Sequence, residues 1–366
     1  MSDAPVSHRR RAATPETPAA TAPPRRRHLD TAAALRSLAI FGTAALAVLR
    51  FASPPTTLLA KPFESVLGGA VPSAAPSPTA YGTSGQVKVR FAMPGQSVEY
   101  PLEVAGNPDS LRYGWVSVDD TVDVAAARPL SGASVIAPEA PGFYHLALLK
   151  ATERRIVSGL TVAVMVPFTQ KIGAMLNGYR IGTYLAERLG GAHSLPEGFV
   201  QIDRDAVDLP LTTHLRLGDF IVHDEQQTWP RYAALSPRLL DKLELVISEV
   251  GRMHGEHARR VSIDGSEADL AVDVHSGFRS PSHNRAVKRS AQDSRHQFGD
   301  AADVTIDADG DGRFTLADTR LVAMAVEAVE AANPDLAGGM GLYTSRRYNT
   351  PYVHIDARGH KARWNG

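Results

Sequence analysis

The C-terminal part of the chain holds three side chains whose types and spacing suit a metal ion. His296 lies in the segment SRHQFGDAAD, Asp303 follows it by seven residues, and His354 lies 51 residues further on. Two imidazoles and a carboxylate suit a borderline cation such as zinc. Three protein ligands would leave the fourth position for water, as in catalytic rather than structural zinc sites. The composition alone leaves another interpretation open, because the chain has 13 histidines and most histidines are surface or hydrogen-bonded residues.

Several motifs around these residues occur in an order that resembles one family. The block SGFRSP spans 276–281, Asn284 follows it, and the pattern Ser-x-His-x-x-Gly-x-Ala-x-Asp spans 294–303 before the segment YVHID at 352–356. This order is similar to that of the zinc D-Ala-D-Ala peptidases, which include murein carboxypeptidases and endopeptidases and share their core with the vancomycin-resistance dipeptidases. The closing segment, with Arg363 and Trp364, resembles the murein endopeptidase branch in particular. The resemblance covers about residues 212–366.

The resemblance implies a role for individual residues. It makes His296, Asp303 and His354 the zinc ligands, and it places Arg279 where relatives hold an arginine against the oxyanion of the reacting carbonyl. A fixed cation beside developing negative charge is consistent with that chemistry. The alternative for Arg279 is a structural salt bridge. The positions that the resemblance assigns to substrate binding are Ser294, Ser280 and Asn284, and Ser294 can equally be a turn cap.

The general base is the point at which the sequence departs from the family. Better-known relatives have a glutamate or a histidine where this chain has Pro351 and Tyr352. Alternation along a strand puts Tyr352, His354 and Asp356 on one face. Asp356 is therefore a candidate base with Tyr352 near the oxyanion, or else Asp356 orients a ligand histidine. Two further histidines, His275 and His360, are weaker candidates for the base.

A second metal motif, which resembles a calcium loop, follows directly. Acidic side chains occupy its positions 1, 3 and 5, a glycine position 6, a backbone carbonyl position 7, and an aspartate position 12, as in a calcium loop. These ligands are Asp307, Asp309, Asp311, Arg313 and Asp318. The aspartate at position 12 reaches less far than the usual glutamate, and the preceding segment reads as a strand rather than a helix. An acidic turn without metal is the alternative.

Hydrophobic periodicity predicts the elements that must position these residues. A helix is expected to begin at Ser236-Pro237, with an apolar stripe from Leu239 to Val250 at helical spacing. A strand is predicted over 302–306 and a helix over 319–332. Short alternating runs between turn residues over 83–167 predict a small antiparallel β-sandwich. The turn Pro141-Gly142-Phe143-Tyr144, which leads into a strand, resembles the late strands of immunoglobulin-like modules. The fold class expected is therefore α+β, with a C-terminal zinc peptidase-like domain after an all-β sandwich.

Composition narrows the class of protein. Of the 366 residues, Lys and Arg number 39 and Asp and Glu number 39, so the zero net charge argues against a general nucleic-acid binder. The absence of cysteine excludes disulfides, thiolate metal sites and a cysteine nucleophile.

The N-terminal region differs from the rest of the chain. Its first 36 residues hold seven arginines against three acids, and an uncharged run of 13 residues follows from Ser37 to Leu49. That run is short for a membrane span, which needs about 20 residues, and it fits a signal-peptide apolar region or a thin anchor flanked by Arg36 and Arg50. A buried helix of a cytosolic protein is the alternative.

These features predict the organisation of the whole chain. We expect a basic cytoplasmic arm over 1–30, a membrane anchor or uncleaved signal over 31–52, a proline-rich linker over 53–82, the sandwich over 83–167, a connecting segment over 168–211 and the peptidase domain over 212–366. The expected function is an exported, membrane-anchored zinc peptidase acting on peptidoglycan peptides in the periplasm or outside the cytoplasmic membrane. A non-catalytic wall-binding module with a structural zinc, or a zinc peptidase for other peptides, is the alternative.

Overall fold

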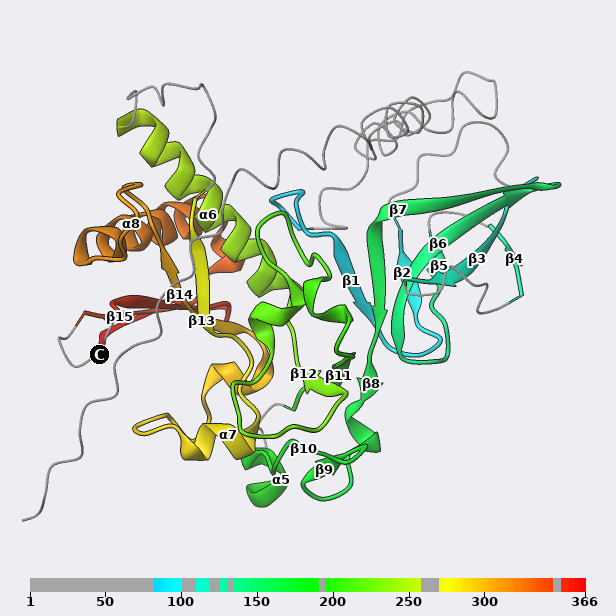
Figure 1. Cartoon of the computed structure of the whole chain (residues 1–366), viewed down its shortest axis with the longest axis horizontal. Coiled ribbons are helices and arrows are strands. Elements are labelled where there is room, and N and C mark those ends of the chain that lie inside the picture. Colours follow the sequence, from blue (N-terminus) through cyan, green and yellow to red (C-terminus); the bar gives the residue numbers. More distant parts are fainter. Residues whose placement is uncertain are drawn as a thin grey trace, which may run out of the picture. The chain divides into compact units, whose positions relative to one another are not determined.

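A computed structural model of the chain describes residues 82–100, 110–118, 126–130, 134–190, 195–257, 270–344 and 350–366 (Figure 1). These residues combine several sheets with few helices, which confirms the mixed α+β class. They all belong to one compact unit, which spans Pro55–Gly366. The predicted arm, the anchor and nearly all of the linker lie outside the described residues. Among the described helices, none is long and apolar enough to cross a membrane.

The region predicted as a sandwich contains a five-stranded sheet of order β1-β7-β6-β3-β4 and a two-stranded sheet of β2 and β5. The strands are β1 (Val89–Ala92), β2 (Ser97–Glu99), β3 (Arg112–Ser117), β4 (Arg128–Pro129), β5 (Ser134–Ile136), β6 (Gly142–Lys150) and β7 (Glu153–Val164). One difference from the prediction is that β1 pairs with β7 in parallel. Alternating hydrophobicity reports burial of one face and does not distinguish parallel from antiparallel neighbours.

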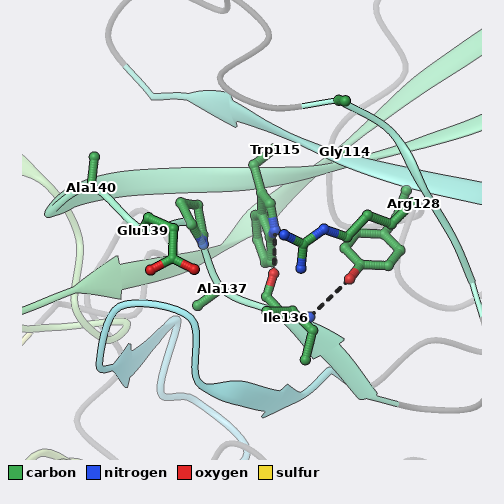
Figure 2. Close-up of a pocket in the computed structure, with 10 residues that line it drawn as sticks. Gly114, Trp115, Arg128, Ile136, Ala137, Glu139 and Ala140 are labelled. Carbon is green, nitrogen blue, oxygen red and sulfur yellow. Dashed lines mark hydrogen bonds between the residues drawn. The ribbon is translucent and has the colours of Figure 1, made fainter.

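A cavity of about 220 Å³ lies in this region, with Tyr113 and Trp115 in its wall (Figure 2). The polar atoms of both rings are already engaged at β5. The indole Nε1 of Trp115 donates to the Ile136 carbonyl at 2.7 Å, and the Ile136 N–H donates to the Tyr113 hydroxyl at 3.0 Å. The charged residues at the cavity are the exposed Arg128 and Glu139. The described residues that line the cavity therefore offer a surface for contact and include no group of side chains that could carry out a reaction.

Residues 168–211 are predicted as a connection, and their described parts, 168–190 and 195–211, form small elements of their own. These elements and their neighbours are β8 (Val166–Pro167), η2 (Phe168–Gln170), β9 (Met175–Leu176), β10 (Tyr179–Arg180), α5 (Leu185–Leu189), β11 (Gly198–Ile202), η3 (Ala206–Asp208), η4 (Leu217–Phe220) and β12 (Arg231–Ala233). β11 pairs with both β8 and β12. Tyr184, which is 1% exposed, donates its hydroxyl to the Gln297 carbonyl at 3.0 Å, so this segment directly contacts the residue after His296.

The C-terminal region is built on a five-stranded sheet of order β13-β14-β16-β15-β17. Its elements are α6 (Pro237–His257), β13 (Val272–Ser276), α7 (Pro281–Ala286), η5 (Arg295–Phe298), β14 (Ala301–Ile306), α8 (Leu316–Ala332), η6 (Pro334–Leu336), β15 (Gly339–Tyr343), β16 (Tyr352–Asp356) and β17 (Ala362–Asn365). Helices α6 and α8 pack against each other and against β14 (Figure 1). Alternation turns Val304 and Val353 to one face and Asp303 and His354 to the other.

Both long helices follow from their sequences. The predicted stripe of α6 is buried from Leu239 to Val250, and Ser236 accepts the first backbone bonds of the helix. Helix α8 begins at Leu316 rather than at the predicted Thr319. The reason is a capping box, in which Thr315 accepts from the Ala317 N–H while the Asp318 carboxylate accepts from the Thr315 N–H at 2.6 Å.

Candidate metal centre

The candidate metal ligands lie in one row across the C-terminal sheet. In register, Trp364 of β17 pairs with Gly341 of β15, Gly341 with His354 of β16, His354 with Asp303 of β14, and Asp303 with Ser276 of β13. Residues in register on neighbouring strands project from the same face of a sheet. His296, on the short helix η5 just before β14, completes the group. The sheet thus brings together side chains from segments far apart in the sequence.

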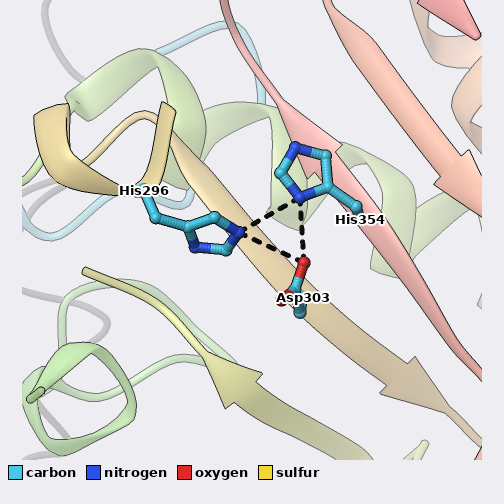
Figure 3. A group of neighbouring side chains, drawn as sticks. All are labelled: His296, Asp303 and His354. Carbon is cyan, nitrogen blue, oxygen red and sulfur yellow. Dashed lines mark hydrogen bonds and ion pairs between the residues drawn. The ribbon is translucent and has the colours of Figure 1, made fainter. Parts of the chain in front are cut away.

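The three donor atoms converge to hydrogen-bond distances (Figure 3). Nδ1 of His354 lies 2.9 Å from Oδ1 of Asp303 and 3.1 Å from Nε2 of His296, and that Nε2 lies 3.2 Å from the same oxygen. Ligand bonds of about 2.0–2.2 Å in tetrahedral geometry put neighbouring donor atoms roughly 3.3 Å apart. The three separations, 2.9, 3.1 and 3.2 Å, are slightly shorter than the edges of such a tetrahedron, so small outward shifts of the side chains would accommodate a zinc ion. All three side chains are buried.

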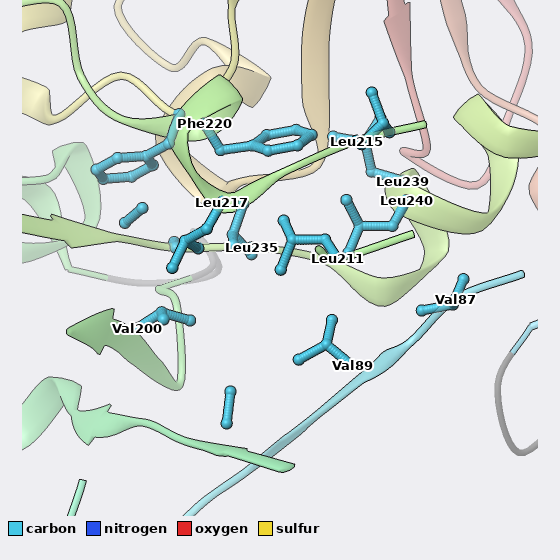
Figure 4. Close-up of a cluster of buried hydrophobic side chains, with 14 of the residues drawn as sticks. Val87, Val89, Val200, Leu211, Leu215, Leu217, Phe220, Leu235, Leu239 and Leu240 are labelled. Atoms are coloured by element: carbon cyan, nitrogen blue, oxygen red, sulfur yellow. The ribbon is translucent and has the colours of Figure 1, made fainter. Parts of the chain in front are cut away.

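The hydrogen bond behind His296 fixes which of its nitrogens faces the group. Nδ1 lies 2.7 Å from the Gly277 carbonyl, which can only accept, so Nδ1 carries the proton and Nε2 keeps its lone pair. Gly277 is in close contact with η4, since a Cβ there would lie 2.8 Å from Cα of Phe220. Phe220 itself is held in a buried cluster with Leu215 and Leu217 (Figure 4). The packing of η4 against Gly277 therefore fixes the position of the Gly277 carbonyl, and that carbonyl orients the His296 ring.

Asp356 plays the corresponding part for His354. Its Oδ2 lies 3.2 Å from Nε2 of His354, so Asp356 can accept a proton held on Nε2, and that tautomer leaves the lone pair of Nδ1 for a metal ion shared with Asp303 and His296. The carboxylate is fully buried and also accepts from the Gly339 N–H at 2.7 Å and from the Arg358 guanidinium. Burial opposes its charge, but these bonds outweigh burial and hold the pKa of Asp356 well below its usual range. Of the two predicted roles, this geometry favours orientation of His354 over proton abstraction.

The chemistry of the donor set fits a cation. With both far nitrogens protonated, Nε2 of His296, Nδ1 of His354 and Oδ1 of Asp303 face one another about 3 Å apart, an arrangement that a shared cation stabilises, either a metal ion or a proton on Nδ1 of His354. Burial lowers the pKa of His296 and keeps it neutral. Burial opposes charge on Asp303 and His354 too, but their mutual contacts hold the pKa of Asp303 well below its usual range and raise that of His354. The buried group can hold a metal ion, and zinc matches its two imidazoles and one carboxylate.

Arg279 forms an ion pair with Asp303, one of the three candidate metal ligands. Its Nη2 pairs with Oδ2 of Asp303, the oxygen that does not face the histidines, and its Nε donates to the Ser276 hydroxyl at 2.7 Å. Within the described residues, Nη1 of Arg279 has no hydrogen-bond partner, and the side chain is 14% exposed. Arg279 therefore orients Asp303 and retains one edge of its guanidinium for another group.

The residues assigned to substrate binding have structural roles in two cases. Ser280 is fully buried and caps α7 by accepting from the His283 N–H at 3.1 Å. Asn284 is also buried and donates to the Ala291 carbonyl at 2.9 Å, while its Oδ1 has no partner among the described residues. Ser294 is half-buried directly before η5, and its hydroxyl makes no capping bond. Of the three, Ser294 lies two residues before His296, and its hydroxyl has no assigned structural role among the described residues.

The other candidate residues lie at the edge of the row. Tyr352 stacks face to face on Tyr343, with ring centroids 4.5 Å apart, and His275 meets Tyr352 edge-on at 5.8 Å. Nδ1 of His275 lies 3.1 Å from the Asp273 carboxylate, and His360 is exposed. These contacts place Tyr352 and His275 next to the row and put neither of them among the converging donor atoms.

The calcium-like loop forms a second acidic group. Asp307, Asp309 and Asp311 lie close enough together to share an ion, and Asp307 is the buried member. Asp318, predicted at position 12, instead accepts from the Ala308, Asp309 and Thr315 N–H groups. Its carboxylate therefore closes the loop onto the start of α8. Calcium binding by this loop, including the Arg313 carbonyl, stays a prediction.

Two contacts of the site were not anticipated from the sequence. Trp364 packs against His354 with ring centroids 5.1 Å apart, and Arg358 holds Asp356. The sequence contains a signal for the first, because Gly341 leaves the space that the indole fills: a Cβ there would lie 2.3 Å from Nε1 of Trp364. That signal needs the strand register to be interpretable.

Comparison with known proteins identifies no relative: no family model, curated protein or solved structure matches the chain.

Proposed function

We propose that the chain is a zinc-dependent peptidase that hydrolyses amide bonds in peptidoglycan stem peptides or cross-links. The proposal includes a D-Ala-D-Ala metallopeptidase fold over residues 212–366, preceded by an immunoglobulin-like sandwich. The observation that carries it is the convergence of His296, Asp303 and His354 on one face of the sheet, with the far nitrogen of each histidine occupied. Such second contacts are typical of zinc-binding histidines.

In this proposal the chain's own residues position the reacting groups. A zinc ion held by the three ligands would supply Lewis-acid chemistry, polarising a peptide carbonyl and lowering the pKa of water. Arg279 keeps Asp303 oriented and turns its free guanidinium edge to the negative charge that develops on the carbonyl oxygen. Ser294 and Tyr352 flank the site and would contact the substrate. Asp356 holds the His354 ring and does not move a proton.

One observation favours the alternative of a wall-binding module with a structural zinc. Pro351 and Tyr352 stand where members of the family that the sequence resembles have a glutamate or a histidine as general base, and both oxygens of Asp356 are taken by other groups. Among the described residues, the carboxylates that contact the ligand group are therefore Asp303 and Asp356, and neither is free to act as a base. Activity on peptidoglycan is the property that separates the two functions.

The test is a digestion of purified peptidoglycan by the full-length zinc-loaded protein, with released peptides identified by mass spectrometry. We expect fragments whose masses name the cleaved bond, and we expect them to be lost in H296A. A matched control is H145N, which changes a histidine of β6 that bonds the Leu160 carbonyl. If folded, zinc-loaded protein releases nothing, the hydrolase proposal is wrong and binding without release supports the wall-binding module. Cleavage of other peptides alone would support a different zinc peptidase.

The proposal places the protein outside the cytoplasmic membrane. The arginine-rich start and the apolar run of residues 37–49 support export with retention at the membrane. Fractionation of cells and protease treatment of spheroplasts test this directly. We expect the chain in the membrane fraction and the C-terminal region to be cleaved from outside. A protected chain in the soluble fraction would contradict the localisation and leave the metal site unaffected.

A further inference from the structure

A closed circuit of side chains surrounds the His354 ring on the side away from the other two ligands. Asp356 meets Nε2 of His354 at 3.2 Å, and Nε of Arg358 lies 2.9 Å from both carboxylate oxygens of Asp356. The guanidinium of Arg358 lies 5.5 Å from the centroid of the Trp364 indole. The centroid of that indole lies 5.1 Å from the centroid of the His354 ring, which completes the circuit. Each member therefore contacts the next, and none besides His354 is a metal ligand.

The indole of Trp364 is itself fixed in place. Its Nε1 donates to the Tyr343 hydroxyl at 3.1 Å. Beneath it lies Gly341, which pairs with His354 on one side and with Trp364 on the other. Because Gly341 has no side chain, Trp364 reaches across β15 to the imidazole. A methyl group at this position would meet the indole at 2.3 Å and displace it.

We propose that Arg358 and Trp364 are positioning residues that hold His354 in the one ring orientation and tautomer that turns Nδ1 toward Asp303 and His296. The inference rests on the metal centre of the proposed function and is independent of the substrate. Rotation of the imidazole by 180° would replace Nδ1 by a carbon atom and break the bond to Asp356. Trp364 blocks that rotation by packing, and Arg358 blocks it by holding the carboxylate.

The predicted consequence is a loss of metal affinity when the circuit is opened. Residues that orient zinc ligands typically change affinity by about 10–100-fold when they are replaced. We expect W364A and G341A to bind zinc about 10-fold or more weakly, in competition with a chromophoric chelator. W364F keeps an aromatic ring over His354, so we expect it to lose less zinc affinity than W364A. The matched control is W229F, because the guanidinium groups of Arg204 and Arg231 lie 5.3 and 5.5 Å from the ring centroid of Trp229 in the wild type.

Two spectroscopic measurements separate positioning from general stability. Long-range ¹H–¹⁵N spectra of the full-length protein are expected to show the proton of His354 on Nε2, and a mixture of tautomers in W364A. Added Co²⁺ is expected to quench tryptophan fluorescence in the wild type and in W229F, and much less in W364F. Because W364F retains an aromatic ring, the cobalt measurement decides the question even where W364A or G341A does not fold.

Wild-type zinc affinity and an unchanged tautomer in W364A and G341A would overturn the inference, as would full cobalt quenching in W364F. Weakened zinc binding together with an inactive wild type would leave the inference standing and reject the peptidase. A wild type that binds neither zinc nor cobalt would reject both.

Discussion

Lys242 on helix α6 gives the sharpest test of how the sheet beneath the metal centre is held. Its side chain is fully buried, and Nζ donates to Glu330 Oε1 at 2.6 Å and to the Asp356 carbonyl at 2.7 Å. Removing one partner of a buried ion pair costs about 3–5 kcal/mol, because the other charge is left unpaired. Arg363 still contacts Glu330 Oε2 at 2.5 Å in K242M, so we expect the lower end, about 3 kcal/mol.

The assay is urea unfolding followed by tryptophan fluorescence, with K361M as the matched control. Lys361 is about half exposed, reaches Glu327 at 3.0 Å and lies 3.8 Å from Glu330 Oε2, which Arg363 also holds, so the same substitution should cost at most about 1 kcal/mol. A loss below about 1 kcal/mol in K242M, or a loss equal to that of K361M, would refute the view that this buried pair anchors β16 to the helices.

Four further predictions concern charge, calcium binding and helix capping. Hydrogen bonds from two cationic side chains lower the pKa of Glu327 to about 2 from 4.5, so its stabilisation is present above pH 4.5 and is lost as the pH falls toward 2. Unfolding curves of E327Q should therefore differ from wild type above pH 4.5 by at most about 1 kcal/mol, since the group is exposed, and should converge in acid; a constant difference would contradict this. D318A should lower stability by about 1–2 kcal/mol through loss of the α8 cap, with or without calcium. If the loop binds calcium, adding the ion should raise the unfolding midpoint of the wild type but not that of D309A. Equal wild-type midpoints with and without calcium would mean that Asp318 acts only as the cap of α8. S280A should destabilise by about 1 kcal/mol and leave the KM for peptidoglycan fragments unchanged, whereas a raised KM would restore its role in substrate binding.

The elements with strong periodicity could be predicted from the sequence. The stripe from Leu239 to Val250 predicts α6 because its apolar residues recur at helical spacing. The same stripe gives no indication that Lys242 and Glu244 on this helix are buried. Their burial depends on partners such as Glu330, which come from distant parts of the chain. The elements described within 168–211 also escaped prediction, because β9 and β10 have two residues each and α5 and β11 only five, too few to show a clear period.

The candidate site was predictable as a set of residues but not as a geometry. Motif order places His296, Asp303 and His354 together, and strand alternation correctly puts Asp356 on the face of His354. Alternation does not tell which imidazole nitrogen Asp356 meets. That choice depends on the rotamer of the ring and on the register across β16, β15 and β17, which also brings Trp364 over Gly341.

The central claim is that three side chains form one zinc centre, and metal analysis of the purified full-length protein tests it most directly. After exposure to zinc and dialysis, we expect about one tightly held zinc per chain in the wild type and in D309N, and none in H296A, D303A or H354A. A wild type that retains no zinc, or alanine variants that retain as much zinc as the wild type, would contradict the account.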